Sequence, residues 1–351
     1  MKTDSTMYVG LDYHQSSIQL CVMDAAGKTL LNRKCDNDLL ALTRHLPKGV
    51  KVQATIEAMP GSADLAEALC RQPGWSVHLA HAQHVARMKR TREKTDRSDA
   101  YVLADLTRVG YVQKVWLPPQ SVRELRRLVS HRLQLVDRAK ALKLRVGSLL
   151  RDHRVKLAGT RWSKPWLLAL AQTVASLPAD SAWIISEQLD ELAHLSMRIK
   201  AADARLKEVT AHDTLTGHLL AQAGVGLITA TALRAAIGRF DRFKNGKSLA
   251  RYCGLSPRNA SSGSRQNQGG LVDDANKRLR SLLIELAWRL MRASGGSGGR
   301  WKAMACRLRD RGKASCLIAA AVANRWVRQL HHQLVEVIDD ANVTRQVPAT
   351  M

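Results

Sequence analysis

The stretch Lys94-Thr95-Asp96-Arg97-Ser98-Asp99-Ala100 places two carboxylates three residues apart, directly after a run rich in arginine and lysine. On a helix with about 3.6 residues per turn, positions i and i+3 share a face, so Asp96 and Asp99 point the same way. Carboxylates held this close repel each other unless a cation lies between them, and oxygen ligands suit magnesium or manganese. The simpler interpretation is a helix start, with Asp96 as the N-cap and Asp99 beside the helix dipole.

Two further carboxylates occur in apolar, strand-like runs of the first hundred residues. Asp12 lies in the run 7–12, and Glu57 ends the run 51–57. Aspartate is disfavoured in strands, so its presence at position 12 needs an explanation. The simplest explanation is a hydrogen bond between the Asp12 side chain and the turn that follows. The patterns also predict strands over 18–23, 29–35 and 75–80, and helices over 38–45, 61–69 and 99–109.

This order of elements is that of an RNase H-like domain, in which the first and fourth strands are neighbours and the last helix packs across their ends. Asp12, Glu57, Asp96 and Asp99 would then converge. Four carboxylates gathered without a cation would be costly, whereas two divalent ions there could act on a phosphodiester. We therefore expect these residues to bind Mg²⁺, with Mn²⁺ as the alternative.

The charge of the chain indicates the class of its partner. Its 351 residues carry a formal net charge of +25, which points first to nucleic acid and second to an anionic membrane surface. No apolar run is long enough to span a bilayer, Met1 does not begin a signal segment, and the six cysteines show no CxxC spacing. We expect a cytoplasmic protein with no membrane partner and no zinc site.

Two long amphipathic helices are predicted after the break at Pro118-Pro119, over 121–153 and 181–210. Their similar lengths favour an antiparallel hairpin or coiled coil. The basic face of the first helix suits a phosphate backbone, or is a solvated face whose side-chain stems cover apolar surface. The candidate nucleic-acid contacts on it are Arg123, Arg126, Arg127, Lys140 and Lys143.

The last third of the chain holds two glycine-containing features. Gly224 and Gly226 lie between two helical segments, as in a helix-hairpin-helix turn that presents backbone N–H groups to a phosphate; an ordinary glycine-capped turn is the alternative. The polar segment from Gly254 to Gly270 is too long for a simple connector. With Arg258 and Arg265 it suits phosphate binding or the presentation of a serine nucleophile, although its composition also fits a flexible linker.

Several of these motifs resemble the insertion-sequence family one-ten transposases, and the resemblance runs from Tyr8 to about Leu334. The motifs are Gly10-Leu11-Asp12, Glu57-Ala58 and Lys94–Ala100, which resemble the DEDD motif, and then Gly254-Leu255-Ser256-Pro257, Ser262-Gly263 and Asn276-Lys277-Arg278-Leu279-Arg280. The family usually follows its glutamate with Ala-Thr-Gly, whereas here Ala58 is followed by Met59-Pro60-Gly61, and Ala275 stands where glycine is usual.

The resemblance implies an N-terminal domain similar to the RuvC resolvase and a C-terminal domain whose nucleophile is Ser262. Ser261 and Ser264 are close enough to leave that register open. It also implies a structured non-coding bridge RNA that pairs with donor and target DNA. The protein would be a homo-oligomer, a dimer or a tetramer, whose two catalytic halves meet across protomers, and it would act in the bacterial cytoplasm at the nucleoid.

We therefore predict an α/β domain followed by all-α domains. Residues 1–117 form a RuvC-like DEDD domain, 118–213 a helical coiled-coil and oligomerisation segment, 214–335 the transposase domain with the serine loop, and 336–351 a disordered tail. The predicted function is a DNA transposase or recombinase with a serine–DNA covalent intermediate. The alternatives are a metal-dependent junction nuclease that uses water, and a non-catalytic nucleic-acid-binding scaffold.

Overall fold

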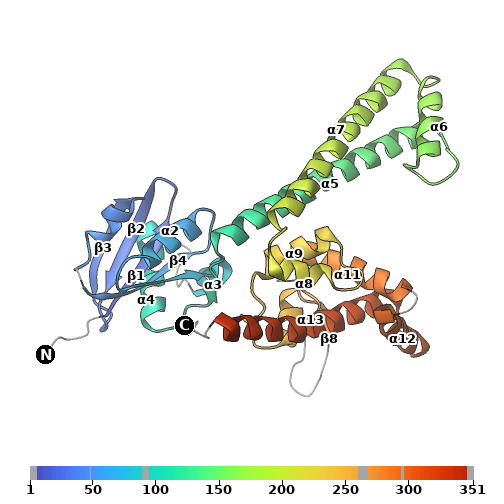
Figure 1. Cartoon of the computed structure of the whole chain (residues 1–351). Helices are drawn as coiled ribbons and strands as arrows, with labels where there is room; N and C mark the ends of the chain where they lie inside the picture. Colours follow the sequence, from blue (N-terminus) through green and yellow to red (C-terminus); the bar gives the residue numbers. More distant parts are fainter. Residues whose placement is uncertain are drawn as a thin grey trace, which may run out of the picture. The chain divides into compact units, whose positions relative to one another are not determined.

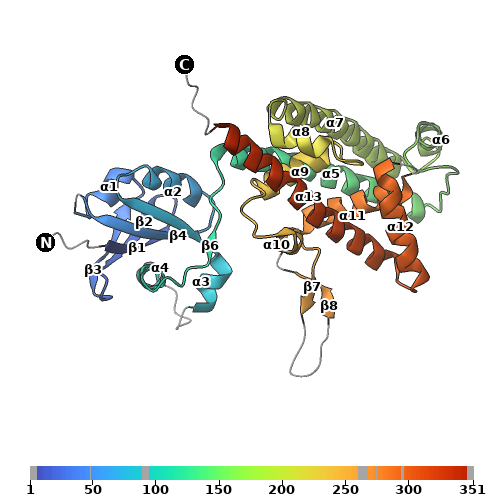
Figure 2. The same ribbon diagram turned by 60° about the horizontal axis from the view of Figure 1, so that its bottom comes forward.

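The structure is a computed structural model that describes residues 6–47, 49–88, 95–259, 268–273, 275–293 and 296–345. The chain forms two compact units, Met1–Gln120 and Ser121–Met351 (Figures 1 and 2). The first unit combines a sheet with helices, and the second is mainly helical. A mixed α/β unit followed by a helical one was predicted, whereas the further division at residue 213 remains a prediction.

The first unit is built on a six-stranded sheet in the order β3-β2-β1-β4-β5-β6. Its strands are β1 (Thr6–Tyr13), β2 (Ser17–Met23), β3 (Thr29–Asp36), β4 (Lys51–Glu57), β5 (Trp75–Ala80) and β6 (Lys114–Val115). The first three strands form an antiparallel meander, β4 runs parallel to β1 and to β5, and β6 is antiparallel to β5. The five predicted strands are present, and the sequence missed only β6, which is too short to show a pattern.

Helices cover both faces of this sheet (Figure 2). On one face, α1 (Leu39–Thr43) and α2 (Ser62–Cys70) contribute Leu42 and Leu69 to a core shared with Leu11 and Ile56. On the other face, α4 (Asp96–Arg108) places Ala100 and Ala104 against Cys21. The short helix α3 (Ala82–Met88) precedes α4. Alternate residues of each strand therefore face α4, which decides where the strand carboxylates point.

Gly10 brings the backbone of α4 directly against β1. A Cβ atom at this position would lie 2.0 Å from the Ala100 carbonyl oxygen and 2.5 Å from the Ala104 nitrogen. Both are backbone atoms, so neither can rotate aside as a side chain would. At the other end of the helix, the hydroxyls of Thr107 and Thr55 are hydrogen-bonded at 2.8 Å. Together these contacts fix the middle and the end of α4 on the sheet.

The second unit begins with α5 (Gln120–Asp152) and α7 (Ala179–Val209), which run side by side in opposite directions (Figure 1). Ion pairs fix this alignment: Arg132 Nε lies 2.9 Å from Asp203 Oδ1, and Arg138 Nη2 lies 3.0 Å from Glu191 Oε1. Both helices were predicted; their supercoiling into a coiled coil stays a prediction.

Helix α6 (Lys164–Val174) was missed, although Ser163 at its N-cap and the proline in its first turn are typical start signals.

The remaining helices share one core. They are α8 (Thr214–Leu220), α9 (Leu227–Ile237), α10 (Gly246–Tyr252), α11 (Lys277–Arg292), α12 (Gly296–Asp310) and α13 (Ser315–Arg345). Phe240, Leu286 and Val322 lie in that core. Helix α11 starts at Lys277 because Asn276 caps it, its Oδ1 accepting a hydrogen bond from the Leu279 N–H at 3.0 Å. None of the described helices combines the length and the apolar character that a membrane span requires.

Two short strands interrupt the segment that the sequence indicated as an irregular loop. The strands β7 (Pro257–Asn259) and β8 (Gln268–Leu271) pair in antiparallel fashion (Figure 2). The sequence missed them because each is short and β8 contains two glycines, which weaken a strand pattern. Residues 260–267 lie outside the described residues.

Helix α13 corrects the prediction of a disordered tail from residue 336. It is helical as far as Arg345. Leu334, Ile338 and Ala341 keep the apolar spacing of a helix, and the first helix-breaking residue is Pro348. The predicted tail is therefore wrong for residues 336–345, and residues 346–351 lie outside the described residues.

Candidate active site

Asp12 and Glu57 end up on the same face of neighbouring strands. Each lies one residue beyond the last pair of the parallel β1–β4 register. Side chains alternate along a strand, and the preceding residues on this face, Gly10 and Thr55, contact α4. Asp12 and Glu57 therefore lie at the carboxyl ends of β1 and β4, on the side that α4 covers.

The other two predicted carboxylates come from the first turn of α4. The N-cap is Thr95, whose Oγ1 accepts a hydrogen bond from the Ser98 N–H at 3.2 Å. The interpretation of Asp96 as the N-cap is therefore wrong, since a threonine hydroxyl already fills that role. The Asp96 side chain is 51% exposed, whereas Asp99 as a residue is only 5% exposed. Lys94, which precedes them in the motif, lies outside the described residues.

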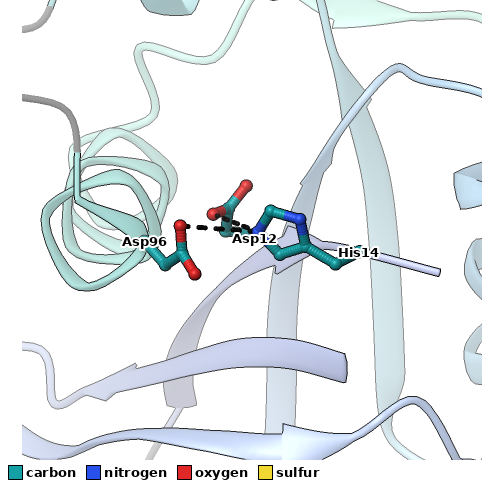
Figure 3. Close-up of side chains that lie close together, drawn as sticks. All are labelled: Asp12, His14 and Asp96. Atoms are coloured by element: carbon teal, nitrogen blue, oxygen red, sulfur yellow. Dashed lines mark ion pairs between the residues drawn. The ribbon is translucent and has the colours of Figure 1, made fainter. Parts of the chain in front are cut away.

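His14 joins these carboxylates, although it was not among the predicted site residues. Its Nε2 lies 3.3 Å from Asp12 Oδ2 and 3.5 Å from Asp96 Oδ1 (Figure 3). One ligand atom from each of the three residues lies within 4.8 Å of the others. The available signal was the spacing Asp-x-His at a strand end, which puts both side chains on one face.

The electrostatics of the cluster favour a bound cation. Asp12 is 9% exposed, and this burial raises the pKa of its carboxyl group. His14 opposes the rise in the pKa of Asp12, whereas the charges of Asp99 and Asp96 add to it. Carboxylate oxygens with excess negative charge are the ligands of hard divalent ions, so the residues present fit Mg²⁺ or Mn²⁺.

The structure thus brings Asp12 and Asp96 together with His14, and Asp99 is close enough for its charge to act on Asp12. Glu57 shares their face of the sheet by its register but lies outside the three-residue cluster. Within the part of the chain that the structure describes, this is the one group of three or more such ligands at metal-binding distance.

We expect Asp12→Asn to stabilise the metal-free protein. Because burial raises the pKa of Asp12, folding disfavours its ionised form, so the wild type loses stability as the pH rises above the ordinary carboxyl value of 3.8. Asparagine has the same size without the charge, and the gain should be roughly 0.5–2 kcal/mol at pH 7, shrinking toward zero near pH 4. Urea unfolding in EDTA at both pH values measures it.

Asp36→Asn is the matched control for this measurement. Asp36 is an exposed aspartate at the end of β3 in the same unit, so its replacement should leave stability nearly unchanged. If Asp12→Asn is no more stable than the wild type at pH 7, the buried charge of Asp12 does not destabilise the fold.

The two predicted phosphate-binding glycines flank the turn between α8 and α9. Gly224 has a φ of +75°, in the left-handed region that favours glycine. Gly226 is the N-cap of α9, makes no side-chain cap hydrogen bond, and a Cβ there would meet no atom within 4 Å. This turn fits a phosphate at the α9 N-terminus, and it fits an ordinary turn equally well.

Two of the predicted basic contacts serve internal packing. Arg123 is 9% exposed, which leaves little of it for a phosphate. Arg126 Nε donates to the Ala235 carbonyl oxygen at 2.6 Å, and its Nη2 donates to that of Ala236 at 3.1 Å. Arg126 therefore fixes α5 to the last turn of α9, and the positions of Arg123 and Arg126 do not support nucleic-acid contact.

The other basic residues are accessible. Lys140 is exposed, Arg127 forms an ion pair with Glu124, and the Lys143 Nζ lies 5.2 Å from the centre of the Trp162 ring. An exposed intrahelical ion pair is weak, so Arg127 can exchange its partner for a phosphate.

The predicted nucleophile lies outside the described residues, as do Ser261, Ser264 and Arg265. The paired residues nearest to it in sequence are Asn259 of β7 and Gln268 of β8. Arg258 is exposed, and a Cβ on Gly269 would lie 3.5 Å from its Nε. Arg258 therefore places an exposed basic side chain on β7, the strand that precedes Ser262 in the sequence.

Both halves of the chain match family models. Residues 9–154 match the DEDD model of the IS110 type, described as "Transposase", and residues 217–302 match the model described as "Transposase IS116/IS110/IS902 family". The first range contains the four acidic residues, and the second contains Gly224, Gly226 and the serine segment.

Several curated proteins are similar over most of the chain. A probable family 20 transposase of Pseudomonas aeruginosa is 30% identical over 278 residues, which cover 77% of this chain and 80% of the relative. The transposase for insertion sequence element IS1111A of Coxiella burnetii is 25% identical, over 81% of this chain and 78% of the relative. The putative transposase y4qE of Sinorhizobium fredii is 28% identical over 63% of this chain, which spans about half of that relative (54%).

Proposed function

This chain belongs to the IS110 family of transposases, and on that premise we propose that it cleaves and rejoins DNA strands with a metal-dependent acidic site and a serine nucleophile. The observation that carries the proposal is the convergence of Asp12, Asp96 and His14, with the charge of Asp99 acting on Asp12. The position of β1 between β2 and β4 supports an RNase H-like fold for this unit.

The acidic residues would hold the ion through oxygen atoms of Asp12, Glu57, Asp96 and Asp99, and His14 adds a nitrogen at the exposed side. When bound, the divalent ion supplies positive charge that neutralises the scissile phosphate. The chain's own contribution is to fix the ligands on rigid elements: two come from strand ends and two from the first helical turn over them. The backbone contact at Gly10 sets the distance between those elements.

Ser262 would supply the nucleophile. Its Oγ forms a bond to phosphorus, the bond from phosphorus to one sugar oxygen breaks, and the serine proton passes to that departing oxygen. Attack by a sugar hydroxyl of another strand reverses these changes, releases the serine and joins the strands. One phosphorus–oxygen bond replaces another in each step, so rejoining needs no external energy source. A serine hydroxyl is weakly nucleophilic at neutral pH and needs activation by a nearby base or cation.

The proposed partners are donor and target DNA, a structured bridge RNA and further copies of this chain. The formal net charge of +25 supports a polyanionic partner, and the accessible basic residues on α5 give it a surface. In the proposed assembly, a homo-oligomer, the acidic site of one protomer meets the serine segment of another.

Removal of divalent ions is expected to abolish strand cleavage. Losing the charge stabilisation of several kcal/mol should slow single-turnover cleavage of DNA carrying the element's ends by about 1000-fold or more. The assay compares EDTA with added Mg²⁺ or Mn²⁺, and a gel shift in EDTA checks that DNA still binds. Undiminished cleavage in EDTA contradicts the metal-dependent site.

Bridge-RNA guidance is tested by purifying the protein from its host and sequencing the RNA that comes with it. We expect one discrete transcript with segments protected by the protein. Recovery of degraded bulk RNA alone contradicts guidance and leaves the acidic site unaffected.

A further inference from the structure

We propose that Gln19 and Asn32 are positioning residues, which hold the first turn of α4 so that Asp96 and Asp99 stay in place against Asp12. This inference rests on the proposed function, because positioning matters only if these carboxylates hold a cation.

A relay of two hydrogen bonds leads from the sheet to the helix. Gln19 is directly opposite Asp12 in the β1–β2 register and is 5% exposed. Its Nε2 donates to Asn32 Oδ1 at 2.8 Å, and the Asn32 Nδ2 donates to the carbonyl oxygen of Arg97 at 3.1 Å. Arg97 directly follows Asp96 in the first turn of α4, so the relay ends between the two carboxylates of that turn.

The register places both amides on the face of the sheet that α4 covers. Asn32 of β3 pairs with Cys21 of β2, and Cys21 packs with Ala100 and Ala104 of α4. Gln19 lies two residues before Cys21 and so points to the same side. The relay is therefore a cross-strand arrangement that ends on the helix.

Asparagine suits the middle position because it accepts and donates at once. Its carbonyl oxygen accepts from Gln19 while its amide nitrogen donates to Arg97. An aspartate accepts but does not donate, and a leucine of similar size does neither. The buried glutamine holds the asparagine in the orientation that reaches the helix.

The first turn needs such a restraint because its own charges oppose its position. The middle of α4 is held by its backbone contact with Gly10, and its last turn by the Thr107–Thr55 hydrogen bond. At the first turn, however, Asp96 and Asp99 approach the like charge of Asp12. Repulsion between them pushes this turn away from the sheet. The Asn32–Arg97 hydrogen bond opposes this repulsion because it joins the sheet to the same turn of α4 that carries Asp96 and Asp99.

Loss of the restraint should weaken cation binding more than folding. Metal affinity depends on ligand atoms staying in place, and replacing a group that orients a ligand directly typically costs about 10- to 100-fold in affinity. Asn32 holds the backbone between two ligands, so we expect a cost at the lower end of that range. Asn32 is only half-buried, and α4 keeps its other contacts, so the fold should tolerate its replacement.

The test measures Mn²⁺ binding to full-length Asn32→Ala without DNA, by isothermal titration calorimetry. We expect binding about 10-fold weaker than in the wild type. The Mg²⁺ concentration for half-maximal cleavage should rise by a similar factor, with the rate largely restored at saturating Mg²⁺. The unfolding midpoint in EDTA should stay within about 2 °C.

Three further variants separate positioning from packing. Gln53→Ala is the matched control, because Gln53 is an exposed amide on β4 whose register partner, Tyr8, packs on the α4 side; it should bind Mn²⁺ normally. Gln19→Met removes the first donor at similar volume and should weaken binding less than Asn32→Ala. The double variant Gln19→Met/Asn32→Ala should be no worse than Asn32→Ala alone, since both act through one hydrogen bond to the helix.

The outcomes distinguish this inference from the function it rests on. If the wild type binds Mn²⁺ and Asn32→Ala binds it equally tightly, the relay is overturned and the metal site stands. If Asn32→Ala loses stability in proportion to affinity, its role is structural, and positioning is again overturned. If the wild type binds no Mn²⁺ and cleaves DNA in EDTA, the proposed metal site itself fails.

Discussion

Asp99→Asn will slow DNA cleavage by about 1000-fold or more and leave DNA binding intact. Asp99 lies in the first turn of α4, is 5% exposed, and its charge acts on Asp12. Asparagine keeps the size of the side chain but removes the charge, so the site loses part of its attraction for a divalent ion. The charge stabilisation that such an ion supplies is worth several kcal/mol, and each 1.4 kcal/mol is about tenfold in rate.

The measurement is single-turnover cleavage of DNA carrying the ends of the element, with a gel shift for binding. Asp105→Asn is the matched control, because Asp105 is on the same helix and pairs with Arg108. That variant should retain nearly full activity. Cleavage by Asp99→Asn at the wild-type rate would contradict the proposed metal site, whereas a wild type that binds this DNA without cleaving it would favour the non-catalytic scaffold.

Ser262→Ala will eliminate the covalent protein–DNA adduct. The prediction follows from the resemblance of the Ser262-Gly263 segment to the family's nucleophile, and alanine removes the only atom that can bond to phosphorus. In a denaturing gel with end-labelled DNA, the wild type should give a protein-linked band that protease treatment removes. Because no other group replaces a lost nucleophile, we expect a decrease of at least about 10⁴-fold in adduct formation.

Ser261→Ala and Ser264→Ala are the controls, and they also settle the register. If one of them removes the adduct while Ser262→Ala keeps it, the nucleophile is that neighbouring serine. If Ser262→Ala still cleaves DNA at the wild-type rate and no variant forms an adduct, water is the nucleophile. The protein would then be a junction nuclease of the kind considered above.

The sheet and the long helices were predictable because their signals are local. Alternation of apolar residues gave the five longer strands, and helical spacing gave α5 and α7 within two residues at each end. The four acidic residues were also identified from the sequence, since they lie at strand ends and in a helical turn. What placed Asp12 and Glu57 on one face was the register, which the order of elements implies.

The features that the sequence missed depend on contacts between distant segments. His14 directly follows the last residue of β1, and only the fold brings it to within 3.5 Å of Asp96. The Asn32–Arg97 hydrogen bond joins residues 65 positions apart. The Asp-x-His spacing marks only the proximity of His14 to Asp12. No local pattern marks the contacts with Asp96 and Arg97, because these residues belong to a distant segment.

The side chain of Gly10, a single hydrogen atom, allows α4 to lie close to β1 and so sets the width of the acidic site. A side chain larger than that of Gly10 would force α4 away from β1, since its Cβ would meet the backbone of Ala100 and Ala104. A chain that kept all four acidic residues but had a larger residue at this position would hold their carboxylates farther apart. Its affinity for a small divalent ion would then be lower. The four acidic residues therefore supply the chemistry of the site, whereas Gly10, which has no functional group, sets the spacing between them.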